Sequence, residues 1–229
     1  MPVEIKICGL STPEALETCA LEGADMAGFI FFNKSPRNVT PQRASQLAAL
    51  ARSFQHPLKT AAVTVDAEDD RLDDIVAAVK PDFLQLHGRE TPQRVAELKE
   101  RYGLPVIKAF AVREKADLEK LAPYEGFADR FLLDAKAPTG SDLPGGNGVS
   151  FDWKLLQALD TKIPWMLSGG LDAENIAEAL AVSGATSIDV SSGVEAAPGR
   201  KDIAKIAAFI KTVRDMPPGG KNYKTAAAG

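Results

Sequence analysis

Short apolar runs alternate with longer amphipathic segments along the 229 residues of the chain. The apolar runs are rich in Val, Ile, Leu and Phe, which is typical of strands that are buried on both faces of a parallel sheet. The pattern predicts eight strands, which are Glu4–Cys8, Met26–Phe31, Lys59–Val65, Phe83–Leu86, Pro105–Ala109, Arg130–Asp134, Pro164–Ser168 and Ser187–Val190.

A segment with helical spacing follows each predicted strand. Thr12, Thr40 and Thr91 each precede a proline, and this places a capping hydroxyl before a residue whose missing N–H costs nothing in the first turn. Gly23 and Gly184 follow helix ends, where a left-handed residue is favoured. The predicted helices are Pro13–Glu22, Pro41–Arg52, Asp69–Val79, Pro92–Tyr102, Lys115–Leu121, Phe151–Leu159, Ala173–Ala181 and Lys201–Arg214.

Eight alternating strand–helix units predict an α/β fold in the form of a closed (β/α)₈ barrel. An open, doubly wound sheet is the alternative, because eight units can also be laid out flat. No shift in composition marks a boundary, so we expect a single barrel domain over residues 1–215 and a mobile tail over residues 216–229. The loop at 136–150 is long for a plain connection, which makes it a candidate functional segment.

The charge and the cysteine content narrow the class of protein. A formal net charge of −4 argues against a nucleic-acid-binding protein, which needs a basic surface, but it allows a local positive pocket for an anionic metabolite. The chain begins without the features of a signal peptide and has no apolar run long enough to span a membrane. With only Cys8 and Cys19, we expect no disulfide framework and a cytoplasmic protein.

Two residues that can transfer protons stand at strand ends. In a parallel barrel, ligands bind at the carboxyl ends of the strands. Cys8 closes the first strand, and Asp134 closes the sixth, where it is either a proton donor or a carboxylate that caps the loop. A thiol with a pKa near 8.5 is only slightly ionised at neutral pH, so Cys8 would need either a lowered pKa or ionisation assisted by substrate.

Two glycine-bearing turns follow the last two strands. Gly169 and Gly170 come after the seventh strand, and Ser192 and Gly193 come after the eighth. Either turn alone could be a tight connection, but two of them in these places favour a phosphate site, because glycine lets backbone N–H groups approach an anion.

Three further side chains have two interpretations each. Arg37, in the loop after the second strand, could hold a carboxylate with its bidentate fork or could be a solvated loop residue. His87, after the fourth strand, is either catalytic or a structural hydrogen-bonding group at the rim. Cys19 reads as a packed apolar residue and His56 as a surface residue. The two histidines and two cysteines predict no metal site, and there is no nucleotide-binding glycine motif.

Taken together, these segments resemble the phosphoribosylanthranilate isomerase family of tryptophan biosynthesis over about residues 3–214. Their order and spacing are more specific than any one motif. The resemblance is carried by Lys6-Ile7-Cys8-Gly9, Ser35-Pro36-Arg37, Gln85-Leu86-His87-Gly88, Leu133-Asp134, Gly145-Gly146-Asn147-Gly148, Phe151-Asp152-Trp153, Leu167-Ser168-Gly169-Gly170-Leu171, Asp189-Val190-Ser191-Ser192-Gly193-Val194-Glu195 and Pro198-Gly199-Arg200-Lys201-Asp202.

The resemblance implies a cofactor-free barrel isomerase that converts N-(5-phosphoribosyl)anthranilate to 1-(2-carboxyphenylamino)-1-deoxyribulose 5-phosphate by an Amadori rearrangement. It implies a general base at Cys8 and a general acid at Asp134. It places the anthranilate end of the substrate near Arg37 and Asp189. The implied phosphate-binding residues are Gly169, Gly170, Ser192 and Gly193. The expected partner is this small phosphorylated substrate, with neither nucleic acid nor membrane, and the expected assembly is a monomer or a homodimer.

Two alternatives stay open from the residues. A related isomerase of histidine biosynthesis carries out a similar rearrangement with a pair of aspartates, but here Cys8 stands where the first aspartate would be. A catalytically silent barrel that binds a phosphorylated metabolite would keep the glycine turns but would not need both Cys8 and Asp134. The segment 62–66, Ala-Val-Thr-Val-Asp, departs from the family pattern because Thr64 replaces an aromatic residue, without removing a proposed acid–base group.

Overall fold

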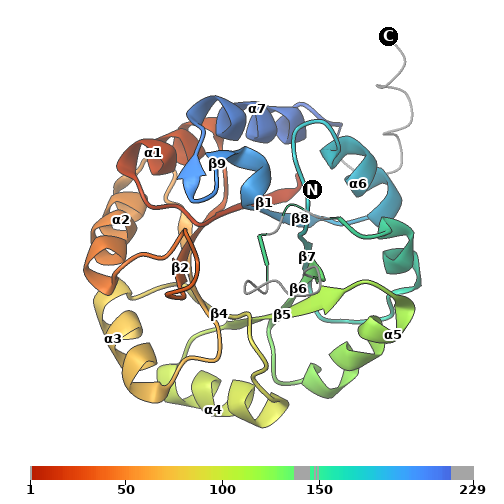
Figure 1. Cartoon of the computed structure of the whole chain (residues 1–229), viewed down its shortest axis with the longest axis horizontal. Helices are drawn as coiled ribbons and strands as arrows, with labels where there is room; N and C mark the ends of the chain where they lie inside the picture. The colour runs from red at the N-terminus through yellow and green to blue at the C-terminus, as the bar shows by residue number, and fades with distance from the viewer. Residues whose placement is uncertain (1, 137–144, 147, 149, 218–229) are drawn as a thin grey trace.

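Eight parallel strands close into a barrel in chain order, with the helices around it (Figure 1). The computed structural model describes residues 2–136, 145, 146, 148 and 150–217. The closed barrel confirms the predicted fold class over the open-sheet alternative. Its strands are β1 (Glu4–Cys8), β2 (Met26–Phe31), β3 (Lys59–Thr64), β4 (Phe83–Leu86), β5 (Val106–Val112), β6 (Arg130–Ala135), β7 (Trp165–Leu167) and β8 (Ser187–Val190).

The helices lie outside the strands and begin where the sequence places their caps. Thr12, Thr40 and Thr91 each accept a hydrogen bond from a backbone N–H in the first turn, and Gly23 and Gly184 are left-handed, as predicted. The helical elements are α1 (Pro13–Glu22), α2 (Pro41–Ser53), α3 (Asp69–Val79), α4 (Pro92–Tyr102), α5 (Lys115–Leu118), η1 (Glu119–Tyr124), η2 (Trp153–Ala158), α6 (Ile176–Ser183), η3 (Ser192–Val194) and α7 (Ile203–Arg214), where η marks a 3₁₀ helix.

Two of the predicted helices are wrong in type or length. The helix predicted over Lys115–Leu121 is α only to Leu118 and continues as the 3₁₀ helix η1, which contains Pro123 and therefore lacks one backbone donor. The segment predicted as a helix over Phe151–Leu159 forms only the 3₁₀ helix η2. Leu156 is its one fully buried residue, so a short turn is enough to cover this part of the barrel.

Other boundaries shift, and one element was not foreseen. Strand β5 runs to Val112 rather than ending at Ala109, and α6 begins at Ile176 rather than Ala173. The last helix begins at Ile203, because the residues before it form a hairpin of β9 (Glu195–Ala197) and β10 (Arg200–Lys201). The tail expected over residues 216–229 lies outside the described residues from 218 onward.

The interior of the barrel has an apolar layer and a polar layer. Alanine, methionine and branched aliphatic side chains fill the apolar layer, and its buried members are Met26, Ala61, Ile107, Ala109, Leu132 and Met166. Lys6 and Lys108 are also buried, and their ammonium groups pair with Asp189 at 2.7 Å and with Glu90 at 2.9 Å. The main core lies between the strands and the helices. None of the helices in the described ranges is long and apolar enough to cross a membrane.

Packing of helices against the barrel predicts a contrast within α1. Leu16 is fully buried, whereas Leu21 is 85% exposed on the same helix. Replacing Leu16 by Ala should lower the free energy of unfolding by about 2–5 kcal/mol, because it leaves a cavity. The matched Leu21→Ala should change it by no more than about 0.5 kcal/mol. Denaturant titrations of the two variants provide the measurement, and equal losses would contradict the described packing.

Candidate active site

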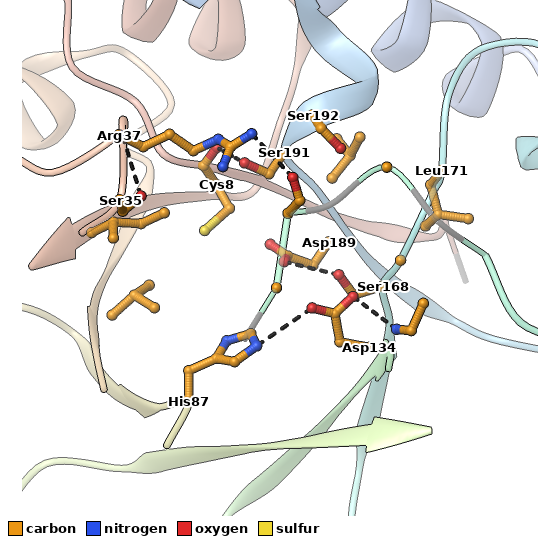
Figure 2. Close-up of a pocket in the computed structure, with 18 of the residues that line it drawn as sticks. Cys8, Ser35, Arg37, His87, Asp134, Ser168, Leu171, Asp189, Ser191 and Ser192 are labelled. Atoms are coloured by element: carbon orange, nitrogen blue, oxygen red, sulfur yellow. Dashed lines mark hydrogen bonds and ion pairs between the residues drawn. The ribbon is translucent and has the colours of Figure 1, made fainter. Parts of the chain in front are cut away.

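One pocket opens at the carboxyl ends of the barrel strands, where parallel barrels bind ligands. Figure 2 shows the side chains of Cys8, Arg37, Asp134 and Asp189 around it, although they come from distant parts of the chain. Gly169, Gly170 and Ser192 also line the pocket. Gly193 follows Ser192 directly and belongs to the same turn. The structure therefore brings the sequence-predicted site residues to one place.

Cys8 is buried at the end of β1 and lines this pocket. Burial raises the pKa of the Cys8 thiol above its usual value, and the nearby Lys6 ammonium acts in the opposite direction. The direction of this shift disfavours a thiolate in the protein by itself. Of the two routes to a thiolate, a permanently lowered pKa and ionisation assisted by substrate, the structure thus supports the second.

Asp134 is buried near the end of β6 and faces a histidine. Its Oδ1 accepts a hydrogen bond from the backbone N–H of Ala135 at 2.9 Å, and its Oδ2 lies 3.4 Å from Nε2 of His87 (Figure 2). The side-chain amide of Gln85 lies 3.2 Å from Nδ1 of His87. With the amide nitrogen donating, neutral His87 carries its proton on Nε2 and presents it to Asp134. The contact supports a hydrogen-bonding role for His87.

Arg37 is not a solvated loop residue, because it is only 4% exposed. Its Nε and Nη2 donate to the two carboxylate oxygens of Glu195 at 2.7 and 2.8 Å. Nη2 also donates to the carbonyl oxygen of Gly146 at 3.3 Å. The bidentate fork therefore faces a protein carboxylate, and Nη1 is the nitrogen that takes no part in this pair of bonds. Glu195 also accepts from Lys201 at 3.0 Å, so its charge is shared between two cations.

Glu195 and Lys201 are functional candidates that the residue patterns alone did not single out. Burial by itself would raise the pKa of Glu195, but hydrogen bonds from Arg37 and the charge of Lys201 hold it below the usual value. The Lys201 ammonium also donates to the carbonyl oxygen of Ser191 at 2.8 Å, and the Ser191 hydroxyl donates to the carbonyl oxygen of Cys8 at 3.1 Å. This network ties the β9–β10 hairpin to the ends of β1 and β8.

Asp189 is held from two sides in the pocket wall. Its Oδ1 accepts from the Lys6 ammonium at 2.7 Å, and its Oδ2 accepts from the Ser168 hydroxyl at 3.4 Å. Its charge is thus balanced inside the barrel before any ligand arrives. His56 is exposed and Cys19 is fully buried, as predicted.

The two glycine turns contact each other through their backbones. A Cβ on Gly193 would lie 1.9 Å from the carbonyl oxygen of Leu171, which follows the turn after β7. Gly169 has φ +92°, and a Cβ there would lie 2.5 Å from the backbone nitrogen of Ala135. Only glycine fits these two positions. The turns form a joint wall of exposed backbone, which is the kind of surface that binds phosphate.

Comparison with known proteins decides among the alternatives that the sequence leaves open. The family model described as N-(5'-phosphoribosyl)anthranilate isomerase matches residues 5–212, almost the whole barrel. The chain belongs to this family. The activity of the N-(5'-phosphoribosyl)anthranilate isomerase family is the rearrangement given above, a step of tryptophan biosynthesis, and it is the activity of this chain.

The match to named relatives spans nearly the full length of each relative. The N-(5'-phosphoribosyl)anthranilate isomerase of Rhizobium meliloti is 61% identical over 214 residues, which are 93% of this chain and 98% of that protein. The enzyme of Brucella canis is 60% identical over 215 residues, 94% of this chain and 96% of that protein.

Solved structures of the family share the fold. The isomerase of Thermotoga maritima superposes with a TM-score of 0.82 at 35% identity and covers 93% of this chain and all of its own. A family structure in complex with reduced 1-(o-carboxyphenylamino)-1-deoxyribulose 5-phosphate has a TM-score of 0.77 at 32% identity, with the same coverage. Another structure, equal to it in TM-score, identity and coverage, shows monomers of the dimeric Thermotoga maritima isomerase.

The contact between the glycine turns predicts a binding defect. Gly193→Ala would push the turn after β8 away from Leu171, so the KM for substrate should rise by about tenfold or more, since one lost phosphate contact costs on the order of 1.5–3 kcal/mol. Steady-state kinetics provides the measurement. Gly103→Ala is the control: that residue has φ +63° and open space around it, so the variant should lose about 1 kcal/mol of stability and keep its KM. An unchanged KM in Gly193→Ala would exclude the wall from substrate binding.

Proposed function

We propose that Cys8 is the general base and Asp134 the general acid with which this chain catalyses the Amadori rearrangement of N-(5'-phosphoribosyl)anthranilate. One observation carries the proposal: a thiol and a carboxyl group from the non-adjacent strands β1 and β6 line one pocket (Figure 2). The reaction needs a proton donor and a proton acceptor at different atoms of one sugar, and the two groups provide them.

Asp134 starts the reaction by giving a proton to the ring oxygen of the ribose. The bond between that oxygen and the anomeric carbon breaks while the anilino nitrogen donates its electron pair, which produces an open-chain iminium ion. The Nε2–H of His87, 3.4 Å from Asp134, orients the carboxyl group and stabilises the carboxylate that it leaves behind.

Cys8 completes the rearrangement by removing the proton from C2′. The electrons of that C–H bond move toward the iminium carbon, and the resulting enolamine tautomerises to the ketone. An isomerisation neither gains nor loses protons in total, so the proton that Cys8 takes balances the one that Asp134 gives. Burial raises the pKa of Cys8 and so disfavours the thiolate, but the positive charge of the iminium intermediate would favour it.

The two ends of the substrate are anionic, and the pocket offers a different partner to each. The backbone at Gly169, Gly170, Ser192 and Gly193 binds the phosphate in the proposal. The Nη1 of Arg37 binds the anthranilate carboxylate, next to Asp189, while Glu195 holds the rest of the guanidinium group in place. Binding energy from both ends then orients the sugar between Cys8 and Asp134.

Membership of the family supports a proposal about the setting in which the enzyme works. We propose that this chain works on a small phosphorylated substrate without a cofactor, in the cytoplasm, and as a monomer or a homodimer. The Thermotoga maritima relative is dimeric and also has a structure as monomers, which supports both assemblies. A direct measurement of the mass in solution distinguishes them.

The acid–base pair predicts a loss of turnover without a loss of binding. Cys8→Ala and Asp134→Asn should each lower kcat by at least about a hundredfold, the scale of losing one general acid or base. The change in anthranilate fluorescence on consumption of the substrate provides the assay. Cys19→Ala, which removes the buried cysteine of α1, is the matched control and should retain normal turnover. Near-normal kcat in either site variant would remove that residue from the mechanism.

The role proposed for Arg37 predicts a defect specific to the carboxylate. Arg37→Ala should weaken binding of a product analogue by about tenfold or more, because a charge-assisted hydrogen bond contributes on the order of 1.5–3 kcal/mol. Titration calorimetry provides the affinities. The loss should shrink for an analogue that lacks the anthranilate carboxylate, and equal losses for both analogues would show that Arg37 acts on the fold rather than on that group.

A further inference from the structure

Lys6 is a fully buried cation that the mechanism above leaves unused. It lies on β1 two residues before Cys8, so both side chains point to the same face of the strand, into the barrel. Its ammonium donates to Asp189 at 2.7 Å. Removing an ammonium group from water costs free energy, and pairing with a carboxylate offsets only part of that cost.

Gly28 shows how close the ammonium and the thiol are. This residue of β2 is the register partner of Cys8. A Cβ built on Gly28 would lie 2.9 Å from Sγ of Cys8 and 3.0 Å from Nζ of Lys6. Both atoms therefore occupy the space that a side chain would take at position 28, and the cation faces the sulfur across it.

Three charged groups act on the thiol. Lys6 on β1 and Lys201 on β10 favour its ionised form, and Asp189 on β8 opposes it. Lys6 has the largest effect of the three. Although burial alone would lower the pKa of Lys6, its partners hold that pKa above the usual value, so the group stays charged.

The second buried lysine of the barrel is used differently. Lys108 pairs with Glu90 and also donates to the carbonyl oxygens of Leu86 and Gly88, at 3.4 and 2.8 Å. The Lys108 ammonium group thus holds the end of β4 and the loop that follows it. Lys6, in contrast, donates to a carboxylate, and its ammonium borders the same space beside Gly28 as the sulfur of Cys8. The two lysines are alike in burial and pairing, and only one of them faces the reacting group.

We propose that Lys6 is a positioning residue for the rearrangement: its ammonium, held by Asp189, is the counter-ion of the thiolate that Cys8 becomes when it acts as base. The inference rests on the general-base role proposed for Cys8. In a dry site a single cation next to the sulfur stabilises the thiolate strongly, because little solvent screens the charge. Lys6 touches no substrate atom in this scheme and acts through Cys8.

The test is a titration of the thiol in the enzyme without substrate. The far-ultraviolet absorbance of the thiolate is followed against pH, with Cys8→Ala as the blank. Burial raises the pKa of Cys19 to about 12, and the Cys8→Ala blank subtracts the contribution of that thiol. Lys6→Met should lower the thiolate fraction of Cys8 at neutral pH by at least about tenfold, which is a rise of about one pH unit in the midpoint.

Two further variants separate charge from structure. Lys6→Met combined with Asp189→Asn removes the pair as a whole, and its midpoint should lie between those of the unaltered enzyme and Lys6→Met, because Asp189 opposes ionisation. Should Lys6→Met not fold, Lys6→Gln keeps a donor for Asp189 without the charge and should show the same direction. Lys108→Met is the matched control, and its Cys8 midpoint should equal that of the unaltered enzyme.

The outcomes distinguish this inference from the mechanism on which it rests. An unchanged midpoint in folded Lys6→Met or Lys6→Gln would overturn the inference and leave the base role of Cys8 untouched. An equal shift in Lys108→Met would overturn it as well, because the effect would then be one of packing. A shifted midpoint together with normal turnover in Cys8→Ala would overturn the base role and with it the inference. Support requires the shift in the Lys6 variants, none in Lys108→Met, and an acid limb of kcat/KM that moves to higher pH with the midpoint.

Discussion

The pairing of the first barrel strand with the last is the contact on which the site depends. Strands β1 and β8 are joined in parallel from Glu4 and Ser187 to Ile7 and Val190. Lys6 and Asp189 are register partners in this seam, so the ion pair lies where the barrel closes. A slip of one residue would turn the lysine to the opposite face of the strand. Closure of the barrel and formation of the Lys6–Asp189 pair in the strand that carries Cys8 are therefore one structural event.

Buried ion pairs are weak arguments for stability, because the cost of desolvation offsets most of the attraction. This protein nevertheless has several, inside the barrel and in the loops at the carboxyl ends of its strands. Arg37 with Glu195 and Lys6 with Asp189 each contribute a residue to the pocket. Apolar side chains fill the other layer of the interior. The buried charges therefore border the pocket, and the apolar layer of the interior lies apart from it.

Local pattern was sufficient for much of the fold and for part of the site. Threonine caps, glycine stops and apolar runs are all readable within a few residues, and the strand ends place Cys8 and Asp134 correctly in the pocket. The two 3₁₀ segments were missed because tertiary packing decides how many turns a short connection needs.

The partners of the site residues could not be predicted in the same way. Arg37 and Glu195 are 158 residues apart in sequence, and Lys6 and Asp189 are 183 apart. No periodicity encodes such a contact. In the sequence, Lys6 lies within a predicted strand, and its pairing with Asp189 is visible only once the barrel is closed.

The hairpin between β8 and α7 has a consequence for how the chain can be rewired. Glu195 on this hairpin holds Arg37, Lys201 holds Ser191, and the backbone of Gly199 packs against the carbonyl of Pro36 in the loop that carries Arg37. The hairpin contributes no strand to the barrel. A circular permutant with its new ends in this hairpin would keep all eight strands of the barrel, yet it would break the hydrogen-bond network that connects the guanidinium group of Arg37 to the backbone of Cys8. The β9–β10 hairpin is therefore outside the barrel sheet, but cutting it would disturb the side chains that border the pocket.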